Sequence, residues 1–479
     1  MIRNLLSIGI FFLFFSYAYA QCPAAPIILS RQSQVDSFRV LYPNCKDLRS
    51  TLRIGFELEY NLLTEEWYCP SFTDITHLDS LLGIKSVFGF MDVQCNSVLS
   101  RLYGLDSMQS VRRSLRIEGN DNLRSIENFP ILNTIGESLR VNEKNINKIE
   151  LPSIRDSILD ISLSSKDTLR AEFLSRIKYT RNLSLDGPLI LDGILNLNRV
   201  DVVRVSNNPL RTDLACFNNS KLENISVLSI ISCQNLGSFQ GLPKIDSMRH
   251  LFIRDCPLDP DFLGSNSSIK LANLSLSAIP NMVDLQRIKD VVISFHPYFY
   301  DNPNLVSLDG LNPKTTIRGC LYLDGNPELT NISALDQISF FNISCIGWGI
   351  RNNPKLEVCN YPILCNFIEN NPGRLTIRNN APGCNSEAEI LEACALVSTE
   401  DVSDTPQASI SLYPNPAHDW VMIRGVADLY SVRLLDMMGR QLRHSSSDRI
   451  DLTDLDAGMY VVQIERADGS RLTKKLIKK

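Results

Sequence analysis

The residues best suited to chemistry in this chain are 13 cysteines and five histidines. The histidines are scattered, at His77, His250, His296, His418 and His444. None belongs to an HExxH metal motif, and the chain has neither a GxSxG nucleophile turn nor a glycine loop that would cradle phosphate. We therefore expect no enzymatic activity and no cofactor or metal. A carboxylate pair assembled only by the fold would escape this search, so a hydrolase is kept as an alternative.

The first 20 residues indicate export. Arg3 precedes an apolar run over residues 5–15, and Ala18-Tyr19-Ala20 then supplies the small residues of a cleavage site. Residues 1–20 are predicted to be a signal peptide, with the mature chain starting near Gln21. A transmembrane helix needs about 20 apolar residues, and no segment reaches that length, so we expect no membrane span in the mature chain. Lipidation at Cys22 is an alternative, but Gln21 stands where a small residue would be expected.

Export decides how the cysteines are interpreted. All of them lie beyond the signal peptide, so they meet an oxidising compartment and are expected to form disulfides, and no CxxC pair argues for metal binding. The odd number leaves at least one cysteine unpaired or paired between molecules. A formal net charge of −5 without basic tracts gives no surface suited to nucleic acid.

A short pattern recurs through the middle of the chain: an apolar-x-apolar strand and a turn ending in Asn, as in Leu115-Arg-Ile-Glu-Gly-Asn120. A second signature, Leu-x-Ser-Leu-x-Gly-Leu, follows several strands, for example over residues 305–311. The second apolar residue of each strand serves as a marker, and successive markers are 20 to 27 residues apart. The markers are Ile117, Val141, Leu163, Leu185, Val205, Ile230, Ile253, Leu276, Phe299, Leu323, Ile350 and Ile377.

Such a repeat predicts stacked coils. One coil of about 24 residues cannot bury its own apolar side chains, but stacking makes a continuous core and a parallel sheet. The two apolar residues of each strand point inward and the residue between them faces solvent. The Asn three places after the marker can satisfy the backbone groups of the bend. The predicted ladder comprises Asn120, Asn208, Cys233, Cys256, Asn302, Asn326, Asn353 and Asn380, and it is interrupted at Lys144, Lys166, Pro188 and Ile279.

Cys233 and Cys256 occupy ladder positions in adjacent coils. We interpret them as buried thiols that replace ladder asparagines, with a disulfide between them as the alternative.

These motifs in series resemble those of bacterial secreted relatives of the leucine-rich-repeat and receptor L-domain families. The resemblance extends over about residues 50 to 385. It implies a mainly β fold, a right-handed leucine-rich-repeat-like solenoid with a parallel β-sheet over residues 51–355. The copies between Val141 and Leu185 depart from the pattern, because their turns are short and lack the Asn.

The same resemblance implies disulfide caps at residues 21–50 and 356–395. Helical spacing from Ser30 to Phe38 and a helix starting after Ser386, with Glu389 completing a capping box, fit such caps. The implied disulfide of the first cap joins Cys22 and Cys45.

The second cap contains Cys359, Cys365, Cys384 and Cys394, for which three pairings stay open. A zinc site made by these four residues is the alternative. Cys69 with Cys95 and Cys320 with Cys345 are further candidate pairs.

The last part of the chain has a different pattern. Residues 396–408 are polar and unpatterned, which indicates a linker. Short alternating segments over residues 409–479, with turns at Met438-Gly439 and Asp468-Gly469, predict a small β-sandwich. This segment resembles the C-terminal sorting domain of the type IX (Por) secretion system, through Tyr413-Pro-Asn-Pro416, Asp436-Met-Met-Gly-Arg440, Leu455-Asp-Ala-Gly-Met-Tyr460 and the tail from Lys474 to Lys479.

This second resemblance implies contact with the type IX secretion machinery and passage through the periplasm and outer membrane. Removal of the domain would follow, and then release or surface attachment of the repeat protein.

Aromatic residues are predicted to gather on the solvent-facing side of the sheet. Phe252, Tyr298 and Tyr322 each precede a marker, and Tyr300 follows one. Clustered exposed aromatics on a rigid sheet are typical of a surface that binds a protein or glycan partner. If loops or the cap cover them, the patch is structural instead. A surface spacer without a discrete ligand is the second alternative function.

Overall fold

The computed structural model describes residues 22–64, 66–190, 195–218, 220–340, 348–399, 411–424, 429–436, 440–466 and 471–479. The predicted signal peptide and the predicted turns at Met438-Gly439 and Asp468-Gly469 lie outside these residues. The chain divides into two compact units, Met1–Leu391 and Glu392–Lys479. No helix among the described residues is long and apolar enough to cross a membrane.

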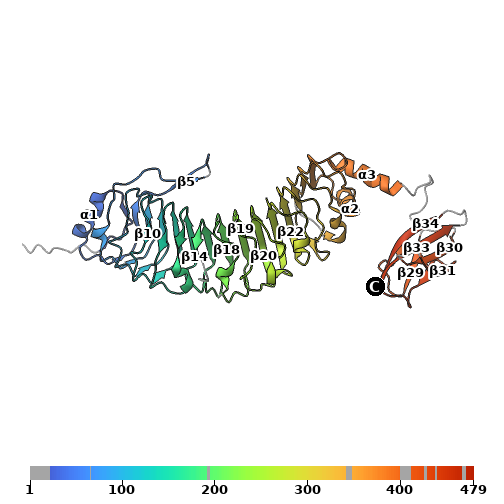
Figure 1. The fold of residues 1–479 in the computed structure, drawn as a ribbon, viewed down its shortest axis with the longest axis horizontal. Coiled ribbons are helices and arrows are strands. Elements are labelled where there is room, and N and C mark those ends of the chain that lie inside the picture. The colour runs from blue at the N-terminus through green and yellow to red at the C-terminus, as the bar shows by residue number, and fades with distance from the viewer. Residues whose placement is uncertain are drawn as a thin grey trace, which may run out of the picture. The chain divides into compact units, whose positions relative to one another are not determined.

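The first unit, called the repeat unit here, is a curved stack of coils, each of which adds one strand to a parallel sheet (Figure 1). Strand order in the sheet follows chain order throughout. The fifteen described strands are β1 (Ile27–Leu29), β3 (Leu52–Gly55), β7 (Met91–Gln94), β9 (Leu115–Glu118), β12 (Ser138–Glu143), β14 (Asp160–Ser165), β16 (Asn182–Asp186), β18 (Val202–Ser206), β19 (Val227–Ile231), β20 (Ser247–Arg254), β21 (Lys270–Ser277), β22 (Val292–Tyr300), β24 (Tyr322–Asp324), β26 (Trp348–Arg351) and β27 (Leu375–Arg378).

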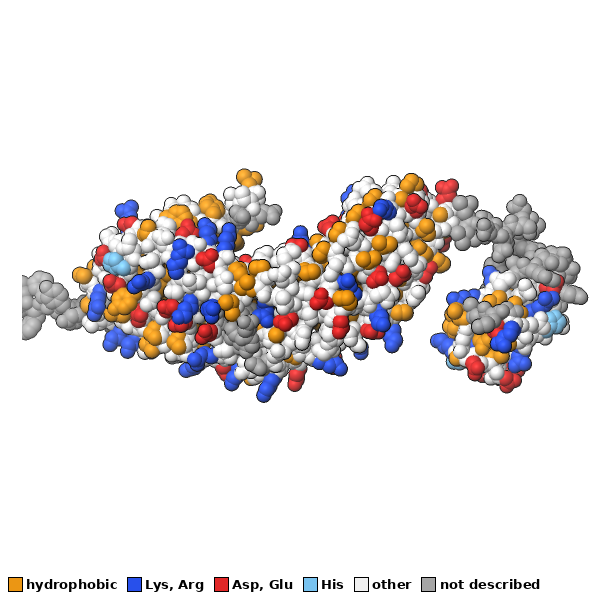
Figure 2. All heavy atoms as spheres, in the orientation of Figure 1, with side chains coloured by type: hydrophobic (Ala, Val, Ile, Leu, Met, Phe, Trp, Pro, Cys, Tyr) orange, Lys and Arg blue, Asp and Glu red, His pale blue; other side chains and the backbone are white. Residues whose placement is uncertain are grey.

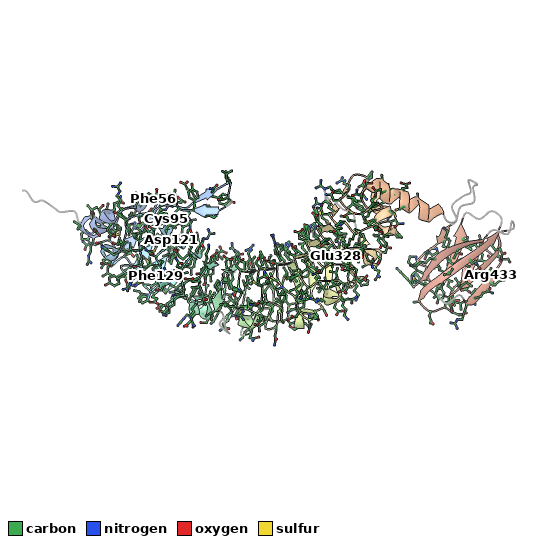
Figure 3. The ribbon with its side chains drawn as sticks, turned by 45° about the horizontal axis from the view of Figure 1, so that its top comes forward. Phe56, Cys95, Asp121, Phe129, Glu328 and Arg433 are labelled. Atoms are coloured by element: carbon green, nitrogen blue, oxygen red, sulfur yellow. A yellow bond between two sulfur atoms is a disulfide. The ribbon has the colours of Figure 1, made fainter. Side chains whose placement is uncertain are left out.

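The register of this sheet aligns all twelve predicted markers, each opposite the next from Ile117 to Ile377. The alignment includes the region between Val141 and Leu185, where the repeat pattern is weakest. Every marker from Ile117 to Ile350 is buried, and Ile377 in the last strand is half-buried. Behind the strands the coils enclose an apolar core, in which Phe129 is fully buried (Figure 3).

Three strands precede the first marker. Leu29, Ile54 and Val93 occupy buried marker positions in β1, β3 and β7. The segment predicted as a separate N-terminal cap therefore contributes a strand to the sheet as well as helix α1 (Gln32–Leu41).

The second apolar corner of the coils forms short parallel strand pairs. One series is β2 (Asp47–Leu48), β6 (Ser86–Val87), β8 (Ser110–Val111) and β11 (Thr134–Ile135). Another is β10 (Ser125–Ile126), β13 (Lys148–Ile149), β15 (Leu169–Arg170) and β17 (Leu189–Ile190), and β23 (Thr316–Ile317) pairs with β25 (Ser339–Phe340). Other coils have a 3₁₀ turn on this side, as at Gln286–Ile288 and Ser333–Gln337.

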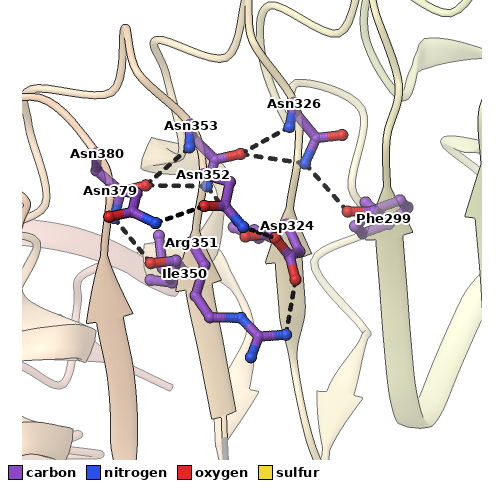
Figure 4. A network of polar contacts seen from close by, with 10 residues as sticks. Phe299, Asp324, Asn326, Ile350, Arg351, Asn352, Asn353, Asn379 and Asn380 are labelled. Atoms are coloured by element: carbon purple, nitrogen blue, oxygen red, sulfur yellow. Dashed lines mark hydrogen bonds and ion pairs between the residues drawn. The ribbon is translucent and has the colours of Figure 1, made fainter.

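The end of most strands is a tight bend in which one residue has a positive φ and the next supplies the ladder side chain. The pairs include Asp301 with Asn302, Gly325 with Asn326 and Asn352 with Asn353. The backbone N–H of Asn326 donates to Oδ1 of Asn353 at 3.1 Å, and Nδ2 of Asn353 donates to the carbonyl of Leu323 at 3.0 Å (Figure 4). The Asn353 amide thus satisfies backbone groups of the preceding coil, and its Nδ2 also donates to Oδ1 of Asn380 in the following coil.

Two of the four interruptions in the predicted ladder are filled by other residues. Lys144 is not the ladder residue of its coil, because β12 continues as extended strand to Glu143. The carboxyl group of Glu143 accepts both the backbone N–H and Nδ2 of Asn120, at 2.8 and 2.6 Å. Ser165, rather than Lys166, serves the next bend by donating to the carbonyl of Ile146. At the fourth interruption, the N–H of Ile279 donates to Oδ1 of Asn302.

Cys233 and Cys256 are buried thiols that are not joined by a disulfide. The backbone N–H of Cys233 donates to Sγ of Cys256 at 3.3 Å, as it would to an asparagine oxygen. Asn96 is a further ladder residue that the repeat pattern missed, and its Nδ2 donates to the carbonyl of Ile54 and to Oδ1 of Asn120.

Disulfides tie both ends of the repeat unit. Cys22 is bonded to Cys45, Cys69 to Cys95 and Cys359 to Cys384. Cys320, Cys365 and Cys394 are also disulfide-bonded, whereas Cys345 lies outside the described residues. All four cysteines of the second cap are therefore disulfide-bonded in this structure.

The second cap contains α2 (Pro362–Asn370) and α3 (Glu387–Thr399), and α3 continues into the segment predicted as the linker. The N–H of Glu389 donates to Oγ of Ser386, as an N-cap requires. The Glu389 carboxylate does not complete the predicted capping box, because it accepts from the N–H groups of Gly383 and Asn385.

The second unit, called the C-terminal unit here, contains two antiparallel sheets that share one core. The first sheet comprises β28 (Ser411–Tyr413), β29 (Trp420–Arg424) and β32 (Arg449–Asp451). The second comprises β31 (Gln441–Ser445), β30 (Leu429–Leu435), β33 (Gly458–Arg466) and β34 (Arg471–Lys478). Val421 and Ile450 from one sheet and Leu434, Val462 and Leu476 from the other are buried between them.

The ladder carboxyl group of Glu143 should make stability depend on pH. Burial raises its pKa from 4.5 to about 8. The folded protein therefore binds this proton more tightly than the unfolded chain, so the contribution is fully present below about pH 4.5 and is lost as pH rises through about 8. We expect Glu143→Gln to remove this pH-dependent contribution. In thermal melts, the Tm of the variant minus that of the native protein should rise steadily from about pH 4.5 to about pH 8.

Glu127→Gln, at an exposed position of a neighbouring coil, is the matched control and should keep the native pH profile. Parallel profiles for native protein and Glu143→Gln would contradict the ladder role of a protonated carboxyl.

Candidate functional site

The outer face of the fifteen-stranded sheet changes in chemistry along the stack. The residue before each marker forms a continuous cross-strand column on this face. The column begins with charged residues in the first coils, continues with small and polar residues, and reaches aromatic residues in the later coils. Its members include Arg53, Asp92, Arg116, Arg140, Ser162, Ser184, Arg204, Ser229, Phe252, Ser275, Tyr298, Tyr322 and Gly349.

Four aromatic side chains, His296, Tyr298, Tyr300 and Tyr322, stack against one another on this face, and we call them the tyrosine cluster. The rings of Tyr298 and Tyr322 lie on adjacent strands with centroids 5.1 Å apart and planes 18° apart. Tyr300 stacks on Tyr298 at 5.8 Å, and His296 stacks on its other side at 5.5 Å. All four are half-buried, so each ring keeps an accessible surface.

The strand pattern of β22 explains this placement. Pro297 and Phe299 are buried, so His296, Tyr298 and Tyr300 all face outward. The residues opposite the cluster are small: Ser275 faces Tyr298, and Gly349 faces Tyr322. A Cβ at Gly349 would come within 3.3 Å of the Tyr322 ring, so the glycine leaves the ring its space. The tyrosine rings therefore form a ridge, with the small residues Ser275 and Gly349 on the strands to either side.

Burial keeps the cluster neutral. It raises the pKa of Tyr300 to about 12, with the neighbouring tyrosines adding to the effect, and it raises the pKa of Tyr298 as well. Burial lowers the pKa of His296, whose Nδ1 accepts the N–H of Cys320 at 2.6 Å. The hydroxyls of Tyr298 and Tyr300 are thus neutral hydrogen-bond donors at physiological pH.

Charge near the cluster is balanced. Nη2 of Arg351 lies 2.6 Å from Oδ2 of Asp324, beside Tyr300 in the sheet. Figure 2 shows basic and acidic side chains interspersed over the face of the repeat unit in view. Recognition at the cluster would therefore depend on ring stacking and hydroxyl hydrogen bonds more than on net charge.

Phe252, the fourth predicted surface residue, lies apart from the tyrosines. Ser275 separates it from Tyr298 in the sheet register, and Phe252 makes no ring contact within the described part of the chain. His296 belongs to the cluster although the sequence analysis counted it only among the scattered histidines. Its position two residues before Tyr298, on the same side of a strand, was the available signal.

The described residues contain no group of three or more His, Cys, Asp or Glu side chains that could hold a metal ion.

In the C-terminal unit, the residues of the recurring motifs hold the sheets together. Nδ2 of Asn415 donates to the carbonyl of Lys475 at 2.8 Å, and its Oδ1 accepts the N–H of Ile477 at 2.9 Å. Asp436 accepts the N–H and Nε of Arg440 across the turn after β30. The Tyr460 hydroxyl donates to the carbonyl of Asp456. These motif residues therefore stabilise the backbone of the C-terminal unit through side-chain hydrogen bonds.

Asn415→Ala should loosen β34, because the strand loses both hydrogen bonds to this amide. At about 0.5–1.5 kcal/mol each, their loss should cost about 1–3 kcal/mol. Hydrogen exchange of the β34 amides should accelerate accordingly. Asp454→Ala removes only an exposed ion pair with Arg443 and should leave exchange near native. Equal protection in both variants would contradict the role assigned to Asn415.

The comparison with protein families agrees with the geometry of the C-terminal unit. Residues 411–479 match the family described as the secretion system C-terminal sorting domain. No curated protein matches the chain. A domain of this family engages the type IX secretion machinery and directs export across the outer membrane, to the cell surface or beyond. Residues 411–479 of this chain are therefore a type IX secretion system C-terminal sorting domain.

Proposed function

We propose that the mature protein is a non-catalytic binding protein that recognises a protein or glycan partner through the outer face of its parallel sheet. The sorting domain is removed after export, and the repeat unit then acts as a secreted or surface-attached recognition module. In this proposal the repeat unit is a right-handed solenoid of the leucine-rich-repeat and receptor L-domain class.

The repeat class is supported by the ladder. Coils of 20 to 27 residues, one aligned strand per coil, and an asparagine after the positive-φ residue of most bends are features that this class would require. The disulfides at both ends also fit this class. The apolar ends of a solenoid need a cap, and disulfides can stabilise such caps in an oxidising compartment.

The observation that carries the binding proposal is the tyrosine cluster. Three stacked tyrosines on adjacent strands form a rigid ridge, and tyrosine offers a large contact area with few rotatable bonds. The hydroxyls of Tyr298 and Tyr300 stay protonated, and all three rings stay partly accessible. Such a ridge can pack against an apolar protein side chain or the flat face of a sugar ring.

The test uses the full-length chain on arrays of glycans and of cell-surface proteins. Tyr298→Ala and Tyr322→Ala should each weaken binding of the selected partner by at least about tenfold, because truncating a central aromatic residue costs about 2 kcal/mol or more. Tyr322→Phe keeps the ring and should lose much less.

Arg204→Ala is the matched control, since it lies in the same outer column several strands away. Native affinity in Tyr298→Ala and Tyr322→Ala would overturn the cluster as the binding site. The absence of any partner on either array would favour the surface-spacer alternative.

A further inference from the structure

A hairpin overhangs the outer face at the N-terminal end of the repeat unit. Its strands, β4 (Glu59–Asn61) and β5 (Glu66–Tyr68), pair antiparallel, and Figure 1 shows it projecting from the coils. The Cys69–Cys95 disulfide joins the returning chain to the bend after β7. The Tyr60 and Trp67 rings pack together at 5.3 Å. The hairpin is therefore stabilised by its own strand pairing and ring contact, and a disulfide attaches its base to the coil.

Between the hairpin and the sheet lies a cleft of about 280 Å³. Glu57, Leu58 and Trp67 line it from the hairpin side. The floor consists of outward residues from four consecutive strands, β7, β9, β12 and β14. They are Gln94, Arg116, Glu118, Arg140, Asn142, Ser162 and Ser164. The volume is near the lower end of the range for small-molecule sites, about 300–1,000 Å³.

The charges around the cleft neutralise one another. Arg53 pairs with Glu57 at 2.8 Å, Arg116 lies 3.7 Å from Asp92, and Arg140 lies 3.8 Å from Glu118. Three guanidinium groups thus face three carboxyl groups. An ionic ligand would have to displace one of these pairs, whereas a neutral ligand can hydrogen-bond to both partners.

Gln94 shows that the floor has unused hydrogen-bonding capacity. Its side chain is only 2 % exposed, and its Nε2 donates to Oε2 of Glu118 at 2.7 Å. Oε1 of the same amide has no hydrogen-bond partner within the described residues. Rotating the amide would bring Oε1 against the carboxylate form of Glu118, so the observed orientation leaves this acceptor unpaired. Burial also raises the pKa of Glu118 and of Asp92.

We propose that this cleft binds a neutral saccharide, as a single sugar residue or the end of a glycan chain. Guanidinium, carboxyl, amide and hydroxyl groups alternate on the floor and match the paired hydroxyls of a sugar, which donate and accept together. A small shift of the floor would let a sugar hydroxyl donate to the buried Oε1 of Gln94. Trp67, 62 % exposed, presents an indole face to the C–H bonds of the ring. The site is separate from the tyrosine cluster and does not depend on its function.

The experiment titrates the full-length chain with methyl glycosides of glucose, galactose, mannose and N-acetylglucosamine, followed by tryptophan fluorescence and calorimetry. Glucuronic acid and glucosamine are the charged comparisons. At least one neutral glycoside should bind saturably below about 50 mM, well within reach of a Kd near 1 mM. Trp67→Phe should remove the fluorescence change, and Arg140→Ala and Glu118→Gln should weaken binding by about tenfold or more.

Arg204→Ala is again the matched control, because Arg204 lies in the same outer column as Arg140 but outside the cleft. Tyr322→Ala should keep native saccharide affinity, which separates this site from the tyrosine cluster. Circular dichroism verifies that each variant folds. The proposal is overturned if no neutral glycoside binds, if the charged sugars bind more tightly, or if Arg140→Ala and Glu118→Gln both bind as native protein does.

Discussion

Each coil of the repeat unit must bend at the end of its strand while the bend stays buried, and the ladder hydrogen bonds make that possible. A buried N–H without an acceptor costs about 1–3 kcal/mol, which explains why the side chain after the positive-φ residue can hydrogen-bond in most coils. Because Asn353 hydrogen-bonds to the backbone of the preceding coil and to the Asn380 amide of the following coil, its bonds also fix the spacing between coils. Neighbouring coils are therefore stable only together.

The period of apolar residues was sufficient to predict the parallel sheet, since each marker needs only its own strand to be recognised. Glu143 was missed because its role depends on β12 continuing one residue further than most other strands, which no residue type announces. The coils of Ile54 and Val93 were missed because the inserted hairpin separates them by 39 positions. His296 and Gln94 became significant only through neighbours from other coils.

Residues on the outer face neither fill the core nor serve the bends, so their types vary along the sheet. Inward positions repeat Leu, Ile and Val, whereas the outward column passes from Arg116 and Arg140 to Tyr298 and Tyr322. One scaffold thus presents a hydrogen-bonding, charge-balanced floor at one end and an aromatic ridge further along. The sorting domain shows the opposite case, because Asn415 and Asp436, the residues that identify it, are those that hold its backbone.

The step from Ile54 to Val93 is far longer than its neighbours, yet the two residues are still paired in register. Extra residues leave the coil and return to it without altering the distance between strands. The repeat unit can thus accept new loops, one coil at a time, while the rest of its face keeps its geometry. The sheet can therefore keep its geometry while the loops of individual coils change.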